Sequence, residues 1–157
     1  MQYLRCLAAI AATVIISTLQ TAQADESADL DAVRQANATL LEVAGSHDID
    51  ALADLWRQDD YVRAIHPFRP IDKGWDEVRD GFLALYELFP EFSSVMPEPD
   101  IRVVGDVAWV SGLEEFKGVM ASGDVIEVTL RTGRIFEREG DKWLVVYHQV
   151  SPPPEEE

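Results

Sequence analysis

Residues 125–150, VIEVTLRTGRIFEREGDKWLVVYHQV, contain two long runs that are rich in β-branched and aromatic residues. The first run covers 125–136, the second covers 143–150, and the polar turn EGD at 139–141 separates them. Such runs on either side of a short glycine-containing turn predict two antiparallel strands. Two shorter runs of the same kind, 101–104 and 107–112, precede them and are separated by Gly105 and Asp106. The C-terminal half of the chain therefore predicts an antiparallel meander.

The N-terminal half has the periodicity of helices. A first helix is expected from Ser27 or Asp29 to Gly45, and a short second helix from Asp50. The clearest helical stripe ends at Pro90 and consists of Trp75, Val78, Phe82, Leu85 and Phe89. Three helices followed by a meander predict an α+β fold, in which a curved, mainly antiparallel sheet folds over the helices.

Residues 1–24 have the order of regions found in secretory signal peptides. They contain one basic residue, Arg5, no acidic residue, an apolar stretch over 7–16, and an A-x-A site that ends at Ala24. The apolar stretch is too short to span a membrane, so we expect cleavage after Ala24 and release into the periplasm or outside the cell. An uncleaved membrane anchor is the alternative. One domain is then expected over 25–151, followed by a disordered Pro/Glu tail over 152–157.

The charge of the chain restricts its partners. The formal net charge is −16, and removing the single positive charge of Arg5 with the signal peptide makes it −17. A chain this acidic, without a basic patch, is not expected to bind nucleic acid or an anionic membrane surface. The only cysteine, Cys6, leaves with the signal peptide, so no disulfide is expected.

Three motifs carry a family resemblance. They are DIDAL at 48–52 with LW at 55–56 and DD at 59–60, KGWDEVR at 73–79, and WLVVYHQVS at 143–151. In this order they resemble the nuclear transport factor 2-like superfamily, especially its SnoaL-like branch, over nearly all of residues 29–152. The resemblance implies a cone-shaped α+β barrel with an apolar pocket at its open end, and usually a homodimer through the sheet. It does not imply one reaction, because members include polyketide cyclases, ketosteroid isomerases, dehydratases, assembly modules and binding proteins.

Two histidines are the candidates for catalysis. His66 precedes Pro67, near the place where ketosteroid isomerases have an acid-before-proline general base, and an imidazole suits proton transfer near neutral pH. The alternative is a histidine that hydrogen-bonds at a loop turn. His148 lies in the last predicted strand, where strict alternation separates it from Trp143 and Tyr147. It is either a catalytic histidine or one with its hydrogen bonds satisfied in the sheet.

Several aromatic residues and an arginine are candidates for the ligand-binding wall. Arg131 and Arg134 lie on opposite faces of one predicted strand, so one of them could anchor a carboxylate or phenolate, unless both pair with surface acids. We also expect His66 to point into the cavity that Trp75 helps to line. The ordinary hydrophobic core is the alternative role for the aromatic residues. The full set of ligand-binding candidates is Trp56, Tyr61, Trp75, Tyr86, Trp109, Arg131 and Tyr147.

Other kinds of site find little support in the sequence. The resemblance would place the oxyanion tyrosine of ketosteroid isomerases at Leu40 and its partner acid near Thr132 or Gly133, so neither donor is present. The histidines have no metal-ligand spacing, and no phosphate-binding glycine loop or nucleophile elbow occurs. We therefore predict no metal and no cofactor.

Three functions remain open. The first is a module that binds a small apolar or aromatic molecule, and the incomplete catalytic set favours it. The second is a cofactor-free cyclase, isomerase or dehydratase with His66 as its general base. The third is an interaction module. The last long strands have apolar residues on both faces, so we predict a homodimer through the outer face of the sheet.

Overall fold

The structure, a computed structural model, describes residues 26–67 and 69–152. The predicted signal peptide, residues 1–24, lies outside the described residues, as do residues 153–157 of the predicted tail. Pro152 is described, and its carbonyl accepts a hydrogen bond of 3.1 Å from Arg131 Nε.

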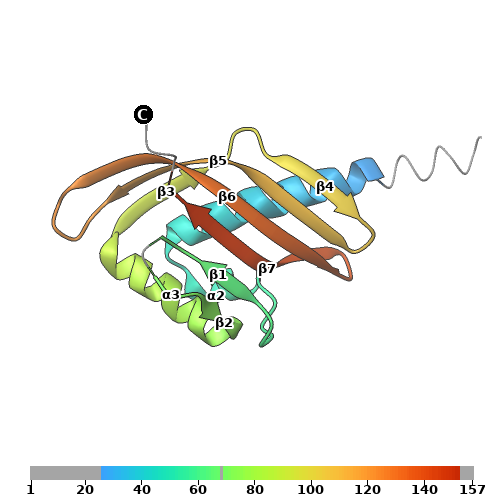
Figure 1. Ribbon diagram of the computed structural model, residues 1–157, viewed down its shortest axis with the longest axis horizontal. Helices are drawn as coiled ribbons and strands as arrows, with labels where there is room; N and C mark the ends of the chain where they lie inside the picture. The colour runs from blue at the N-terminus through green and yellow to red at the C-terminus, as the bar shows by residue number, and fades with distance from the viewer. Residues whose placement is uncertain (1–25, 68, 153–157) are drawn as a thin grey trace, which may run out of the picture.

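Three helices precede most of the sheet (Figure 1). The first is helical over residues 26–46. The second, α2 (Ile49–Ala53), is capped by Asp48, whose side chain accepts a hydrogen bond from Ala51 N. The third is α3 (Gly74–Leu88). Among the described residues, no helix has both the length and the apolar character needed to cross a membrane.

The strands form one curved sheet. Their order is β2-β1-β7-β6-β5-β3, and β4 also pairs with β5. Only β1 with β7 is parallel among these pairings; the others are antiparallel. The strands are β1 (Arg63–Ile65), β2 (Asp72–Lys73), β3 (Glu91–Val95), β4 (Asp100–Val104), β5 (Val107–Val119), β6 (Val125–Glu139) and β7 (Lys142–Ser151).

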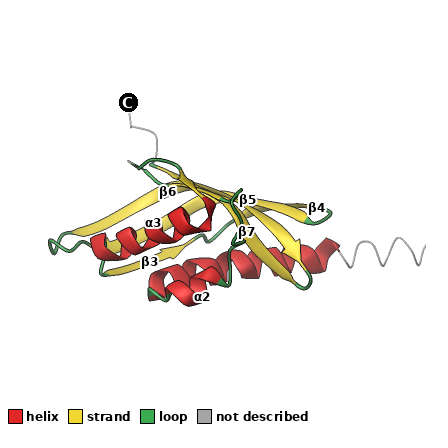
Figure 2. Ribbon diagram, turned by 90° about the horizontal axis from the view of Figure 1, so that it is seen from below, coloured by secondary structure: helices red, strands yellow, loops and turns green. Residues whose placement is uncertain are grey.

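The predicted fold class is confirmed. Figure 2 shows the helices packed on one side of the curved sheet, as expected for three helices followed by a mainly antiparallel meander. The sequence patterns did not indicate β3, because three of its five residues are exposed and two are serines. This strand forms because β5 continues beyond β4 to Val119, and its far end pairs with residues 91–95.

The helices bury apolar side chains against the inner face of the sheet. Val33 and Leu52 on the helical side and Val110, Phe136 and Val145 on the sheet are almost fully buried. Each such side chain contributes about 1.5–3 kcal/mol through removal of its surface from water. Arg138 also ties the first helix to the sheet, because it pairs with Asp29 and lies 4.4 Å from the centre of the Trp143 ring.

A bulge in β7 decides which of its side chains face inward. Ile135 pairs with Tyr147 but the next residue, Phe136, pairs with Val145, so Val146 is an extra residue on β7. Before the bulge, Trp143 and Val145 belong to the core; after it, His148 faces inward. The strict alternation expected from the sequence is therefore broken within this strand.

Candidate functional site

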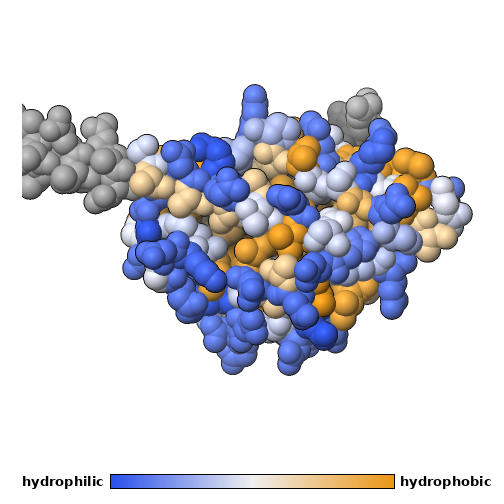
Figure 3. Space-filling model, turned by 180° about the vertical axis from the view of Figure 1, so that it is seen from behind, coloured by the Kyte–Doolittle hydropathy of each residue, from blue (hydrophilic) through white to orange (hydrophobic). Residues whose placement is uncertain are grey.

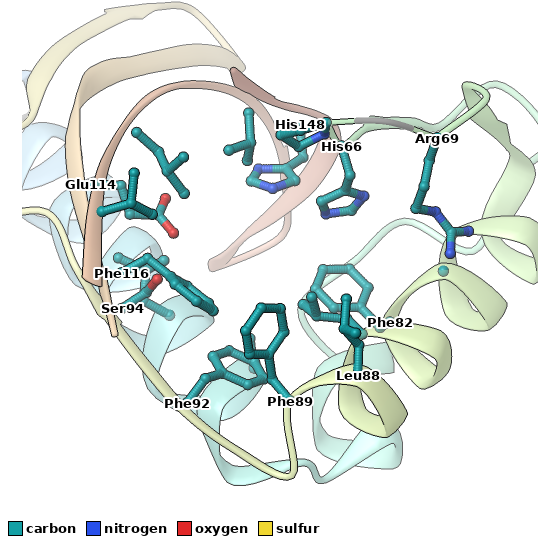
Figure 4. A pocket seen from close by; sticks show the side chains of 18 of the residues that line it. His66, Arg69, Phe82, Leu88, Phe89, Phe92, Ser94, Glu114, Phe116 and His148 are labelled. Carbon is teal, nitrogen blue, oxygen red and sulfur yellow. The ribbon is translucent and has the colours of Figure 1, made fainter. Parts of the chain in front are cut away.

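A cavity of about 570 Å³ lies between the helices and the inner face of the sheet. Its wall comes from the end of the first helix, the segment after β1, α3, β3 and strands β5 to β7 (Figure 4). This volume is within the range of small-molecule sites in proteins.

Most of the cavity wall is apolar. Four phenylalanines among the described residues belong to it, and Ile126, Val128 and Leu130 line it from alternate positions of β6. Figure 3 shows that apolar side chains also reach the surface near the end of the molecule that holds the β5–β6 hairpin. The phenylalanines are Phe82, Phe89, Phe92 and Phe116.

Two histidines lie side by side in this wall. The centres of the His66 and His148 rings are 5.1 Å apart, and Figure 4 shows both on the side of the cavity opposite Phe89 and Phe92. The parallel pairing of β1 with β7 explains their proximity, because Ala64 is the register partner of His148 and His66 follows directly after β1. The sequence analysis named both residues, and the structure brings them together.

His66 is held next to a buried carboxylate. Its Nδ1 lies 3.7 Å from Asp72 Oδ2, and Arg69 Nη2 lies 3.2 Å from the other oxygen of Asp72. Burial by itself raises the pKa of Asp72, but His66 and Arg69 outweigh this and hold that pKa below its usual value. Asp72 is therefore ionised at neutral pH, and it lies close enough to stabilise a positive charge on His66.

A glycine in the middle of α3 makes room for this carboxylate. A Cβ atom at Gly81 would lie 2.7 Å from Asp72 Oδ2, closer than such atoms approach without displacement. Glycine inside a helix costs about 1 kcal/mol relative to alanine. The missing side chain at this position lets Asp72 and Arg69 lie against the helix beside His66.

His148 is buried and neutral. Burial, followed by the positive charge of Arg134 and by His66, lowers the pKa of His148 well below its usual value. Its Nδ1 is buried and has no hydrogen-bond partner among the described residues. Trp56 packs edge-on against the imidazole, with ring centres 6.5 Å apart. A neutral imidazole offers one hydrogen-bond donor and one acceptor.

A buried ion pair lines the cavity on the sheet side. Arg134 Nη2 pairs with Glu114 Oε2, and Arg134 Nη1 donates a hydrogen bond of 2.8 Å to Asn37 Oδ1. Both charged side chains are almost completely buried. Burial lowers the pKa of Arg134, and the adjacent Glu114 carboxylate opposes that shift.

The aromatic candidates on the helical side lie outside the cavity wall. Trp56 and Trp75 pack on each other in the core, with ring centres 6.1 Å apart, so Trp75 does not share a cavity with His66. Tyr61 donates a hydrogen bond to Glu137 and is half exposed; this bond, then burial, raises its pKa to about 12. Tyr86 stacks on His47 at 4.4 Å, and burial followed by the charge of Asp48 raises its pKa to about 12.

The candidates on the strands lie on the other face of the sheet. Trp109 is 46% exposed and pairs across the strands with Ile135. Arg131 is exposed and bonds to Pro152, and the hydroxyl of Tyr147 donates to Gln149 Oε1 at 2.7 Å. They do not line the cavity because their side chains point away from the helices.

Sequence reasoning missed Glu114, Arg69 and Asp72, and chose Arg131 over Arg134. A signal for Arg134 was present, because it has the same parity along β6 as Ile126, Val128 and Leu130, whereas Arg131 shares the parity of Glu127 and Thr129. No local pattern identified Asp72, which reaches His66 only through the pairing of β1 with β2.

Within residues 26–67 and 69–152, no group of three or more His, Cys, Asp or Glu side chains is arranged to hold a metal ion. His66 and His148 nevertheless form one polar end of the cavity, and the Arg134–Glu114 pair adds charged groups on the sheet side.

Comparisons with known proteins agree with the fold. The model of the SnoaL-like domain family matches residues 33–155. A proposed dehydratase of the nuclear transport factor 2-like family from Streptomyces avermitilis is 21% identical, with a TM-score of 0.75 over 82% of this chain and 99% of that one. The association domain of CaMKII from C. elegans is 17% identical, with a TM-score of 0.63 over 81% of this chain and 98% of that one.

Among curated proteins, the F-box protein SKIP8 of Arabidopsis thaliana is 24% identical over 120 residues, which cover 76% of this chain and 49% of that protein. The chain thus spans about half the length of this relative.

Proposed function

Because this chain belongs to the SnoaL-like domain family, we propose that it binds a small, largely apolar molecule in the cavity between its helices and its sheet. The observation that carries the proposal is the cavity of about 570 Å³, whose apolar wall has His66 and His148 side by side. Such a combination of apolar walls with a few convergent polar groups is typical of ligand sites.

Replacing His66 with alanine should weaken the binding of a test ligand, 2-naphthol, by about 1–2 kcal/mol, the scale of one hydrogen bond. The dissociation constant, measured by titration calorimetry, checks this. His47→Ala is the matched control, because His47 does not line the cavity. Unchanged affinity in His66→Ala, with both variants folded by circular dichroism, would count against a role of His66 in binding.

The second candidate function is a cofactor-free lyase or isomerase with His66 as general base. The proximity of His66 to the ionised Asp72 favours it, since a nearby carboxylate stabilises the protonated form of an imidazole. The buried, neutral His148 would then donate a hydrogen bond to the oxygen on which charge develops.

The same His66→Ala variant tests this candidate. In D2O, an enzyme of this type should exchange the acidic α-protons of 2-tetralone, and the variant should lose that exchange, as followed by NMR. Asp72→Asn should reduce it, because the neutral amide stabilises the imidazolium less. Binding of 2-tetralone without exchange would leave the protein a binding module.

We also propose that the protein forms a homodimer through the outer face of its sheet. Trp109 and Leu113 are 46% and 59% exposed there, and cross-strand pairing aligns Trp109 with Ile135 and Tyr147. The first half of β6 is more polar on this face than the sequence analysis assumed, since Glu127, Thr129 and Arg131 follow Val125. The proposed dimer is therefore supported by the cross-strand row of Trp109, Ile135 and Tyr147, and by the similarity of the fold to an association domain.

Trp109→Glu should convert the protein from dimer to monomer, because it places a charge in the centre of an apolar contact. Light scattering at micromolar concentration measures the mass. Ile71→Glu, an equally exposed apolar residue outside the sheet face, should leave the dimer intact. A monomeric wild-type protein would contradict the proposal.

Export remains a proposal that is based on residues 1–24. We expect the secreted protein to begin at Asp25, because Ala22-Gln23-Ala24 forms a good cleavage site. Intact-mass measurement of the protein secreted by its native host checks this, and a mass that includes residues 1–24 would contradict it.

A further inference from the structure

The charged groups around the cavity cancel in pairs. Arg134 is bound to Glu114, and Arg69 lies 3.2 Å from Asp72, so each arginine in the cavity wall has a carboxylate partner. Of the carboxylates, Glu114 itself lines the cavity, while Asp72 lies behind Arg69 and His66. Arg134 is thus not free to act as the anchor for a carboxylate or phenolate that the sequence had suggested.

This pairing disfavours ligands with a net charge. A ligand carboxylate would meet the Glu114 carboxylate without a free cation to balance it, and juxtaposed like charges oppose binding strongly. The net charge of −16 over the whole chain also repels anions. A ligand cation would find both carboxylates already occupied by arginines. An uncharged ligand avoids each of these costs.

Two imidazoles give one end of the cavity a polar surface. His66 and His148 both line the cavity, with ring centres 5.1 Å apart, and the side chain of His66 is 15% exposed. His148 Nδ1 and Arg134 Nε are buried beneath this wall, out of reach of a ligand, and have no hydrogen-bond partner among the described residues. An imidazole can donate or accept a hydrogen bond, so this end of the cavity suits a ligand oxygen.

The apolar part of the cavity wall indicates the shape of the rest of the ligand. Phe89, Phe92 and Phe116 line the space away from the histidines, and β6 adds Val128 and Leu130. Phe82 packs edge-on against His66, with ring centres 5.6 Å apart. Aromatic rings pack well against a flat apolar body.

We propose that the ligand is an uncharged, mainly apolar molecule with a hydroxyl or carbonyl oxygen at one end, which binds between His66 and His148, and that carboxylic acids are excluded. This inference rests on the proposed binding function and adds the ligand class to it.

Three compounds with the same naphthalene ring system test the proposed ligand class. They are 2-naphthol, naphthalene and 2-naphthoate, each titrated into the protein at pH 7 and fixed salt. We expect 2-naphthol to bind at least about tenfold more tightly than either of the others, which is about 1.4 kcal/mol. Equal or tighter binding of 2-naphthoate would overturn the ligand class while leaving the binding function in place. Failure of all three probes to bind would overturn both.

Two variants test which residues are responsible for this ligand selectivity. In Glu114→Gln, Arg134 loses its counter-charge, so 2-naphthoate should bind at least about tenfold more tightly than to the wild type. Glu115→Gln, at the neighbouring exposed position of β5, is the matched control and should change nothing. In His148→Leu, the preference for 2-naphthol over naphthalene should fall towards unity, while Tyr147→Phe retains it. A preference that survives in folded His148→Leu would overturn the placement of the ligand oxygen.

Discussion

Replacing Arg134 with methionine should lower the free energy of unfolding by about 3–5 kcal/mol, because it leaves the buried Glu114 carboxylate without a counter-charge. The arginine is almost fully buried, and it also donates a hydrogen bond to Asn37 on the first helix. One side chain therefore joins β5, β6 and the helical layer. Equilibrium unfolding in urea, followed by tryptophan fluorescence, measures the change.

Arg131 provides the matched control on the same strand. Its side chain is exposed and bonds only to the carbonyl of Pro152 among the described residues, so Arg131→Met should stay within about 0.5 kcal/mol of the wild type. The double variant Arg134→Met/Glu114→Leu should recover most of the loss, since it removes both charges. If the double variant were as unstable as Arg134→Met alone, the unpaired carboxylate would not be the cause.

Acidification should destabilise the protein through His148 well before most carboxylates are protonated. Burial, with the charges of Arg134 and His66, holds the pKa of His148 well below 6.5 in the folded state. The unfolded chain therefore binds a proton near pH 6.5 that the folded protein does not. The contribution of His148 to the free energy of unfolding is therefore fully present above the pKa that this residue has in the unfolded chain. Below that pH it falls by up to about 1.4 kcal/mol per pH unit, until the pKa of His148 in the folded protein is reached.

Comparison with His148→Leu isolates this contribution. Leucine cannot titrate and suits the apolar surroundings, so between about pH 7.5 and 5 the free energy of unfolding should fall more steeply for the wild type than for the variant. Protonation of Asp72 also lowers the free energy of unfolding, but at a lower pH. The pKa of Asp72 is lowered in the folded protein, so its stabilising effect disappears only as it becomes protonated. Parallel pH profiles for the wild type and the variant would contradict the assignment to His148.

Elements with strong periodicity could be predicted from local sequence alone. The stripe from Trp75 to Phe89 predicted α3, and the β-rich runs predicted β4, β5, β6 and β7, because side-chain periods of 3.6 and 2 are local properties of the chain. The same stripe contained Phe82 and Phe89, which line the cavity. Polar signals were weaker: His66 and His148 could be named as candidates, but nothing local showed that they are neighbours.

Which side chains meet in the cavity depends on how the elements pack. His66 lies beside His148 only because β1 pairs in parallel with β7. The paired residues of these two strands are more than 80 positions apart in the chain. The extra residue at Val146 changes which side chains of β7 point inward. A prediction that assumes strict alternation along the strand could not reveal this change. Glu114, Arg134 and Asn37 come from three separate elements, and the ion pair and the hydrogen bond that join them form only after those elements pack. Periodicity specifies one face of one element, whereas a site depends on the register between elements, and that register is fixed by long-range hydrogen bonds and packing.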